Sequence, residues 1–161
     1  MKTAILDIET LGLDPFKDRV VAVGIWSEEE ESPELMVSED EKALLEWAWQ
    51  KISEFELIVG WNIKKFDLWF LKIRSLKHGI KAREIPCLDL MELLFPNGQK
   101  WKRLSDVNEF LFGTRMGKEN SGRMVSEAFL QKDFQKIEEY LRKDLEITKR
   151  IYERAKACFN L

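Results

Sequence analysis

The sequence predicts an α/β fold in which helices and strands pack in layers. Three strand patterns follow one another at the amino terminus, a helix–strand–helix–strand alternation comes next, and helical patterns complete the chain. This order of elements is typical of layered α/β folds. The 161 residues, 45 % hydrophobic and 34 % charged, suit one domain with one core, so we expect a single domain over 1–161.

The expected strands are short, apolar and mostly rich in β-branched residues. We place them at residues 3–8, 19–27, 34–37, 57–60 and 85–88. An acidic run at 28–31 separates the second from the third. We interpret this run as a solvated hairpin tip, because charged residues favour exposed turns.

Capping residues and glycines indicate where the helices begin and end. Ser38 and Glu41 have capping-box spacing and precede apolar residues that recur every three or four positions. Helices are also expected over 66–77 before Gly79, before Pro96, from Ser105 to Gly113, and from Asp133 toward Cys158. His78 is expected to be an ordinary helix-end residue.

Composition and charge exclude several classes of protein. A net charge of −3 lacks the strongly basic balance of many nucleic-acid-binding proteins. The two cysteines, Cys87 and Cys158, are too far apart for a CxxC-type metal site, and a disulfide scaffold is not indicated. No signal-peptide pattern or apolar run of membrane-spanning length is present. We therefore expect a cytoplasmic protein without membrane association.

The first strand carries two acidic residues, Asp7 and Glu9, near its end. Residues i and i+2 of a strand point to the same side, so both carboxylates would project together. Like charges held close repel each other, and burial adds a desolvation cost. A divalent cation would offset both effects.

Two further acidic residues occur in patterns that allow more than one interpretation. Asp67 lies at a helix start, where it could serve as a cap or interact with the helix dipole. Tyr140 and Asp144 are four residues apart on the last helix and share one mostly apolar face. The alternative for Asp144 is a boundary residue paired with a neighbouring Lys or Arg.

The order of these residues resembles the three exonuclease motifs of the DEDD superfamily. The motifs are Asp7-Ile8-Glu9-Thr10, Asn62-x-x-x-Phe66-Asp67 and Tyr140-x-x-x-Asp144. The second motif is most similar to the proofreading domains of family B DNA polymerases and to small stand-alone exonucleases related to them. The resemblance implies a ribonuclease H-like fold, a five-stranded mixed sheet flanked by helices. It also implies the tyrosine subtype, because Glu139 stands where the other branch has histidine.

The resemblance further implies a 3′–5′ exonuclease that uses two Mg²⁺ or Mn²⁺ ions. Asp7 would bridge both ions, Glu9 and Asp144 would complete the site of one, and Asp67 would support the other. Tyr140 would orient the attacking water. Carboxylate and water ligands suit these hard cations, and paired metals are a known solution for phosphodiester hydrolysis. Asp89, after the fifth strand, is a candidate for the edge of the site.

The expected substrate is the 3′ end of single-stranded or frayed DNA or RNA. Thr10, Leu11 and Asn62 are candidates for contacting the terminal nucleotide, and Phe66 for stacking on its base. Basic residues gather where phosphates would lie: residues 62–83 contain seven Lys or Arg and one acid, and Lys100, Lys102 and Arg103 surround Trp101.

Two other functions remain open from the sequence. One is a nucleic-acid-binding module that has the fold without activity, and the other is a ribonuclease H-like endonuclease, which would also use clustered carboxylates. The tyrosine motif favours the exonuclease. A polymerase or repair enzyme is the class of partner protein to expect.

Overall fold

The computed structural model describes residues 1–116 and 121–161, and its centre is a five-stranded sheet in the order β3-β2-β1-β4-β5. The strands are β1 (Thr3–Thr10), β2 (Val20–Ser27), β3 (Glu34–Val37), β4 (Leu57–Gly60) and β5 (Cys87–Asp89). β2 is antiparallel to both β1 and β3, whereas β1, β4 and β5 are mutually parallel. The predicted mixed sheet is confirmed.

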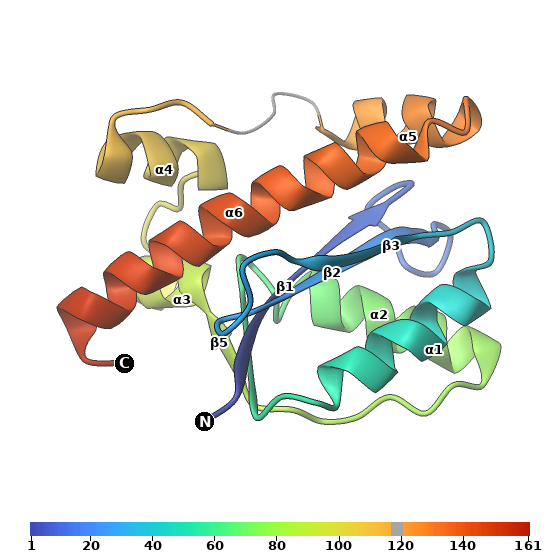
Figure 1. Cartoon of the computed structure of the whole chain (residues 1–161), viewed down its shortest axis with the longest axis horizontal. Helices are drawn as coiled ribbons and strands as arrows, with labels where there is room; N and C mark the ends of the chain where they lie inside the picture. Colours follow the sequence, from blue (N-terminus) through green and yellow to red (C-terminus); the bar gives the residue numbers. More distant parts are fainter. Residues whose placement is uncertain (117–120) are drawn as a thin grey trace.

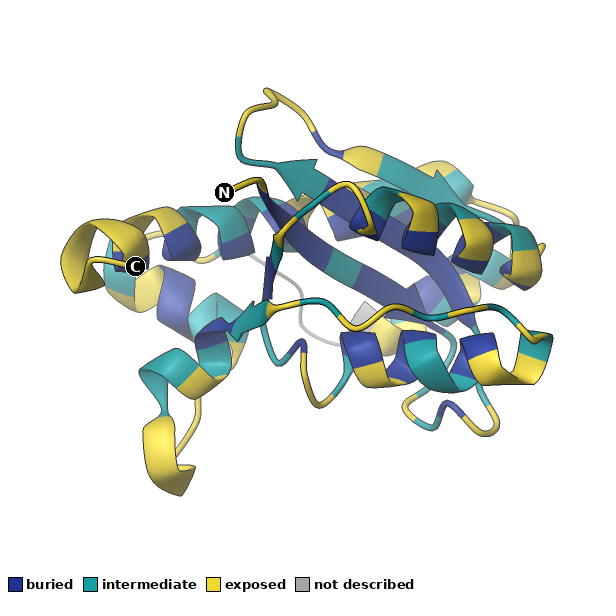
Figure 2. Cartoon of the chain, turned by 90° about the horizontal axis from the view of Figure 1, so that it is seen from below, coloured by how far each residue is buried: buried dark blue, intermediate teal, exposed yellow. Residues whose placement is uncertain are grey.

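Helices cover both faces of this sheet (Figure 1). They are α1 (Glu41–Ile52), α2 (Asp67–His78), α3 (Leu90–Leu94), α4 (Leu104–Phe112), α5 (Ser121–Leu130) and α6 (Phe134–Phe159), with a 3₁₀ turn at Pro96–Gly98. One apolar cluster joins the sheet to α1 and α2, and a second joins it to α3, α4, α5 and α6. The strands are therefore largely buried between two helical layers, while the outward sides of the helices are exposed (Figure 2).

The first strand is longer than predicted, and this places both acidic residues inside it. β1 continues to Thr10, two residues beyond the predicted end, and Glu9 and Thr10 are buried. The fifth strand is also displaced from the prediction, since it covers Cys87–Asp89 rather than 85–88. Its pairing with β4, from Ile58–Cys87 to Gly60–Asp89, determines this register.

Two predicted helix starts were wrong. Asp40, not Ser38, caps α1 by accepting a hydrogen bond from the Ala43 backbone N–H at 3.0 Å. α4 begins after Arg103, and Ser105 lies within its first turn. In contrast, Asp133 caps α6 as predicted, and Gly79 and Gly113 end their helices with φ of 66° and 70°. Glycine adopts this left-handed conformation without a Cβ clash.

Local sequence patterns do not predict α5. Gly122 lies near its start and lowers its intrinsic helix propensity. Val125 and Ala128 are nevertheless buried, and the helix packs against α6 and β1. Tertiary packing therefore explains a helix that local propensity does not predict. Among the described residues, no helix is both long and apolar enough to cross a membrane.

Candidate active site

A close approach of α6 to β2 determines where the acidic residues of the site meet. In the strand register Gly24 of β2 lies opposite Asp7 of β1. A Cβ atom added to Gly24 would lie 2.6 Å from Leu145 Cδ1 and 3.0 Å from Leu141 Cγ, both on α6. The missing side chain thus lets α6 pack directly on the sheet, and Asp144, next to Leu145, comes to the side of β1 that carries Asp7.

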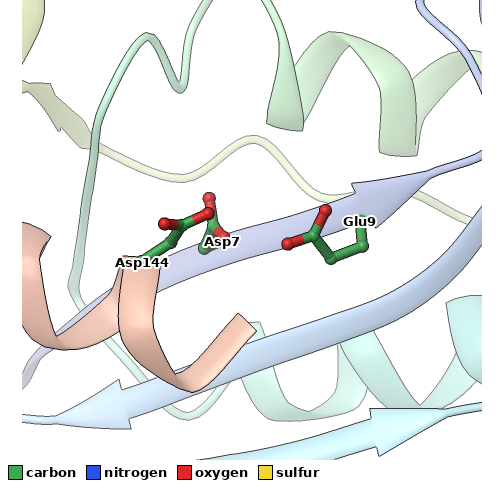
Figure 3. A group of neighbouring side chains, drawn as sticks. All are labelled: Asp7, Glu9 and Asp144. Carbon is green, nitrogen blue, oxygen red and sulfur yellow. The ribbon is translucent and has the colours of Figure 1, made fainter. Parts of the chain in front are cut away.

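Asp7, Glu9 and Asp144 form a cluster of three carboxylates. Each contributes an oxygen atom, and these atoms all lie within 4.8 Å of one another. Asp144 reaches the middle of β1 beside Asp7, and Glu9 lies farther along the same strand (Figure 3). Glu9 is buried, whereas Asp7 and Asp144 are half-buried. The i, i+2 interpretation of Asp7 and Glu9 is thus consistent with the arrangement in the structure.

The donor set of this cluster fits a hard divalent cation. Three carboxylates at this spacing repel one another, and partial burial raises the cost of keeping them ionised. Oxygen-only ligands are those that Mg²⁺ and Mn²⁺ prefer. The geometry therefore suits binding of such an ion by Asp7, Glu9 and Asp144.

Asp67 lies near this cluster but, among the described residues, is not part of the group of three. It begins α2, is 3 % exposed, and accepts a hydrogen bond from the Ile8 backbone N–H at 3.1 Å through Oδ1. Burial raises the pKa of Asp67 well above its usual range, and the nearby charges of Glu9 and Asp89 raise it further. Two backbone hydrogen bonds oppose this shift. The hydrogen bond from Ile8 to Asp67 therefore connects the second motif directly to the first.

Tyr140 lies one helical turn before Asp144 on α6. Its side chain is half-buried, and its hydroxyl oxygen is shielded from solvent. The four-residue spacing puts Tyr140 and Asp144 on the same side of the helix. The phenol is thus on the face of α6 that contributes to the cluster.

Thr10 and Leu11 help to close the loop that follows β1. The Thr10 hydroxyl donates to the Gly12 carbonyl at 2.6 Å, and the Leu11 N–H donates to the Arg19 carbonyl at 3.0 Å. Leu11 is only half-buried. The most exposed apolar residues of this loop are Leu13 and Phe16, at 79 % and 71 %. Neither residue was among the candidates predicted from the sequence, although apolar residues among Gly, Asp and Pro are a usable signal for a contact surface.

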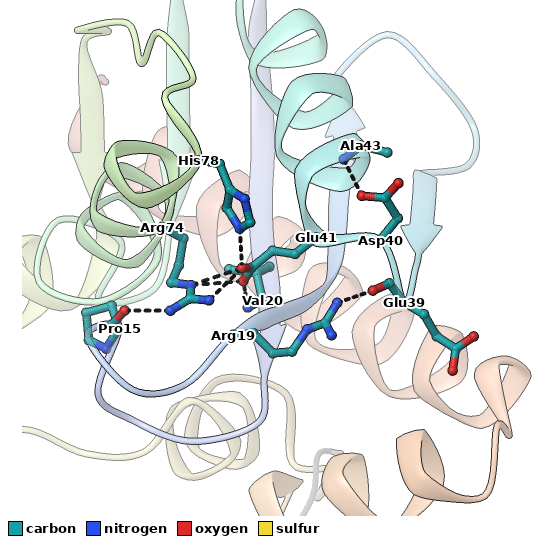
Figure 4. Close-up of polar contacts among 9 residues, drawn as sticks. All are labelled: Pro15, Arg19, Val20, Glu39, Asp40, Glu41, Ala43, Arg74 and His78. Carbon is teal, nitrogen blue, oxygen red and sulfur yellow. Dashed lines mark hydrogen bonds and ion pairs between the residues drawn. The ribbon is translucent and has the colours of Figure 1, made fainter.

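A buried ion pair between α1 and α2 contacts the same loop (Figure 4). Arg74 of α2 donates to Glu41 of α1 at 2.6–3.1 Å and also to the Pro15 carbonyl at 3.2 Å. Glu41 accepts from the Val20 N–H at 2.7 Å. His78 Nε2 lies 2.7 Å from the same carboxylate, so this helix-end residue takes part in the network. The middle of the loop, at Pro15, and its junction with β2, at Val20, are thereby attached to the helical layer.

Asp89 holds the loop that contains Asn62. Its carboxylate is 2 % exposed and accepts from the backbone N–H groups of Asn62, Lys64, Met91 and Glu92. Asn62 adopts a left-handed φ of 55° in this loop. These backbone contacts give Asp89 a structural role in positioning the second motif.

The predicted nucleotide-stacking residue, Phe66, is half-buried. Its ring packs on Phe70 with centroids 5.4 Å apart, beside the α1–α2 apolar cluster. Three of the seven basic residues in 62–83 are in ion pairs: Lys64 with Glu92, Lys72 with Glu84, and Arg74 with Glu41. These pairs reduce the positive charge that this segment could offer to phosphate.

Comparisons with known proteins agree with this fold. A family model described as the RNase_H superfamily matches residues 4–156. An uncharacterized protein of Methanocaldococcus jannaschii is 31 % identical over 169 residues, covering 95 % of this chain and 94 % of that protein. The family B DNA polymerase of the hyperthermophilic archaeon Pyrobaculum calidifontis shares the fold, with a TM-score of 0.79 and 19 % identity. This match covers 96 % of the present chain and 24 % of the polymerase.

The fold is therefore ribonuclease H-like, as expected, and the family match extends over nearly every described element. The carboxylate cluster lies within the matched residues. The chain belongs to the RNase_H superfamily.

Proposed function

We propose that this protein is a metal-dependent 3′–5′ exonuclease that removes nucleoside 5′-monophosphates from single-stranded or frayed DNA or RNA. The observation that carries the proposal is the convergence of Asp7, Glu9 and Asp144 within 4.8 Å. Tyr140, one turn before Asp144, matches the tyrosine motif that distinguishes one exonuclease subtype. Membership of the RNase_H superfamily supports a nuclease.

The carboxylates would hold two Mg²⁺ or Mn²⁺ ions. Asp7, Glu9 and Asp144 are the residues for this role, and Asp67 would support the second ion directly or through water. Bound ions of this kind activate water and neutralise charge on the phosphate and the leaving oxygen.

The remaining residues would position the substrate. The Tyr140 hydroxyl would donate a hydrogen bond to orient the attacking water. The exposed Leu13, together with Leu11 and Asn62, would contact the terminal nucleotide and separate it from its neighbour. Splaying out a paired base costs on the order of a few kcal/mol and less at a frayed end, which explains the expected preference for unpaired ends.

The direction of digestion tests the proposal. Wild type with Mn²⁺ should shorten a 5′-labelled oligonucleotide into a ladder, and should release labelled mononucleotide at once from a 3′-labelled one. The Asp7→Ala variant should remain folded and lose at least ~10³-fold in rate, because metal binding supplies several kcal/mol of transition-state stabilisation.

Circular and matched substrates separate the alternatives. Prompt cleavage of a closed single-stranded circle would identify an endonuclease. Binding of labelled strands without any cleavage, in wild type and Asp7→Ala alike, would identify a binding module. Parallel DNA and RNA oligonucleotides of the same sequence determine which of the two is preferred.

A further inference from the structure

A hollow of about 660 Å³ lies where α4 meets the end of α3. Its lining residues include the apolar Leu94, Phe95, Phe110 and Leu111, with Lys102 and Asp106 as the polar ones. This volume is in the range of small-ligand sites. None of these residues has a role in the catalytic site proposed above.

Phe110 of α4 lines this hollow and is 86 % exposed. A second exposed aromatic residue, Trp101 at 59 %, directly precedes the lining residue Lys102 in the chain. Exposed apolar groups that gather beside a hollow usually mark a binding surface, since isolated ones are common but clustered ones are not.

The hollow lies on the same side of the sheet as the carboxylates. Asp7 follows Ile5 at the i+2 position, and Ile5 belongs to the apolar cluster that also contains Val107 of α4 and Leu90 of α3. Because β1, β4 and β5 are parallel, their carboxyl ends meet at one edge. α3 begins directly after β5. β5 is the second strand from β1 in the sheet, and two strand spacings amount to about 10 Å.

An aromatic contact connects the hollow to the second motif. The Phe95 ring meets Trp61 edge to face, with centroids 6.2 Å apart. Trp61 immediately precedes Asn62, a candidate contact for the terminal nucleotide. The hollow is therefore linked through Phe95 and Trp61 to the segment that carries the second motif.

The basic charge around the hollow favours an anionic partner, and the aromatic rings beside this charge favour a nucleic acid among anions. Lys100, Lys102 and Arg103 lie within four residues of one another, on a chain of net charge −3. Arg103 is paired with Asp106 at 3.1 Å, which offsets the acidic group of the lining. Aromatic rings next to basic side chains are the combination that single-strand-binding surfaces use.

We propose that this hollow binds an unpaired nucleobase upstream of the 3′ end. Phe110 and Trp101 would stack on the base, and Lys102 would lie beside the phosphate backbone of the bound strand. The inference rests on the proposed function, because it assumes that the terminal nucleotide lies at the carboxylates. Every other base that the protein contacts then lies on the 5′ side. The hollow would make the enzyme prefer strands long enough to reach it.

Surface variants test this proposal by strand length. Phe110→Ser and Trp101→Ser change exposed side chains, so the fold should remain intact. In an Asp7→Asn background, fluorescence anisotropy should show at least about fivefold weaker binding of long oligothymidylates, as expected for loss of one stacked base. Binding of dinucleotides should be unchanged. Leu130→Ser and Leu76→Ser, at comparably exposed positions of α5 and α2, are matched controls and should bind every length as the parent does.

Crosslinking locates the base and separates this inference from the proposed function. A 5-iodouracil placed a few nucleotides from the 3′ end should crosslink to Trp101 or Phe110, whereas one at the 3′ terminus should not. If the strand crosslinks there but is never cleaved, the binding surface stands and the exonuclease proposal fails. Suppose that wild type digests from the 3′ end, that Phe110→Ser and Trp101→Ser do not weaken binding of long strands in the Asp7→Asn background, and that they do not slow degradation when Asp7 is intact. This inference is then overturned.

Discussion

The carboxylate of Asp67 accepts a hydrogen bond from the backbone N–H of Ile8, the residue between Asp7 and Glu9. β1 pairs with β4 only from Thr3 to Ile5, so the sheet does not provide a β4 partner for Ile8. An acidic residue 59 positions away supplies the acceptor. Asp67 therefore has a structural role on β1 in addition to any role toward a metal ion.

Substituting Asp67 separates these two roles. Asp67→Asn keeps an oxygen that can accept from Ile8 and removes a buried charge, so the thermal stability should not fall. If Asp67 also supports a metal ion, the Asp67→Asn variant should cleave at least ~10²-fold more slowly than wild type. Asp67→Ala should in addition lose about 1–3 kcal/mol of stability, because the Ile8 N–H is left unsatisfied. Full activity in Asp67→Asn would restrict the residue to its structural role.

Removing the hydroxyl of Tyr140 should affect rate more than metal binding. A positioned hydrogen bond to water contributes less than a metal ion, so Tyr140→Phe should reduce the rate by roughly 10–10³-fold. Mn²⁺ affinity measured by calorimetry should match that of wild type. Loss of Mn²⁺ binding in this variant would show that the phenol acts on the metal site instead.

Enlarging Gly24 should weaken the metal site through α6. In Gly24→Val the added atoms would meet Leu141, Leu145 and Leu35, and overpacking of this kind costs about 1–3 kcal/mol. Relief of the clash moves α6, and with it Asp144, away from Asp7, so Mn²⁺ affinity should fall. Ile52→Val is the control, because it weakens packing of α1 on the opposite face of the sheet and should leave Mn²⁺ affinity unchanged. Equal Mn²⁺ affinity in the two variants would contradict the role given to Gly24.

The Glu41–Arg74 pair should make stability depend on acid pH. Burial works to raise the pKa of Glu41, but hydrogen bonds from Arg74, His78 and Val20 outweigh it and leave the pKa lowered. A lowered carboxyl pKa adds stability above the unfolded-state value, roughly pH 4, and this stability is lost as pH falls through the folded-state value. Near neutral pH, Glu41→Gln should cost about 3–5 kcal/mol, because Arg74 is left buried and unpaired.

Denaturant unfolding of wild type and Glu41→Gln between neutral and acid pH measures this effect. The difference in free energy of unfolding should be constant above about pH 5 and shrink below roughly pH 4. The double variant Glu41→Met/Arg74→Met should be less destabilised than Glu41→Gln, since it leaves no unpaired charge. A difference that did not change with pH would mean that the Glu41 charge does not carry the effect.

Local sequence patterns predicted most of the elements. Alternation, β-branched residues and helical periodicity act within a few positions, so they located all five strands and the helices that end at Gly79 and Gly113. Where two caps competed, as for Ser38 and Asp40, spacing alone selected the wrong residue. α5 was missed because its stability depends on packing against α6 and β1 rather than on propensity.

The sequence by itself determined that Asp7 and Glu9 share one side of a strand and that Tyr140 and Asp144 share one side of a helix, since backbone geometry dictates both. Only the tertiary structure decided that these two sides face each other, because that depends on α6 packing against Gly24. The same holds for Asp67 with Ile8, and for Glu41 with Arg74. Their partners lie 59 and 33 residues away, a separation that local periodicity cannot encode and that folding of the whole chain has to bridge.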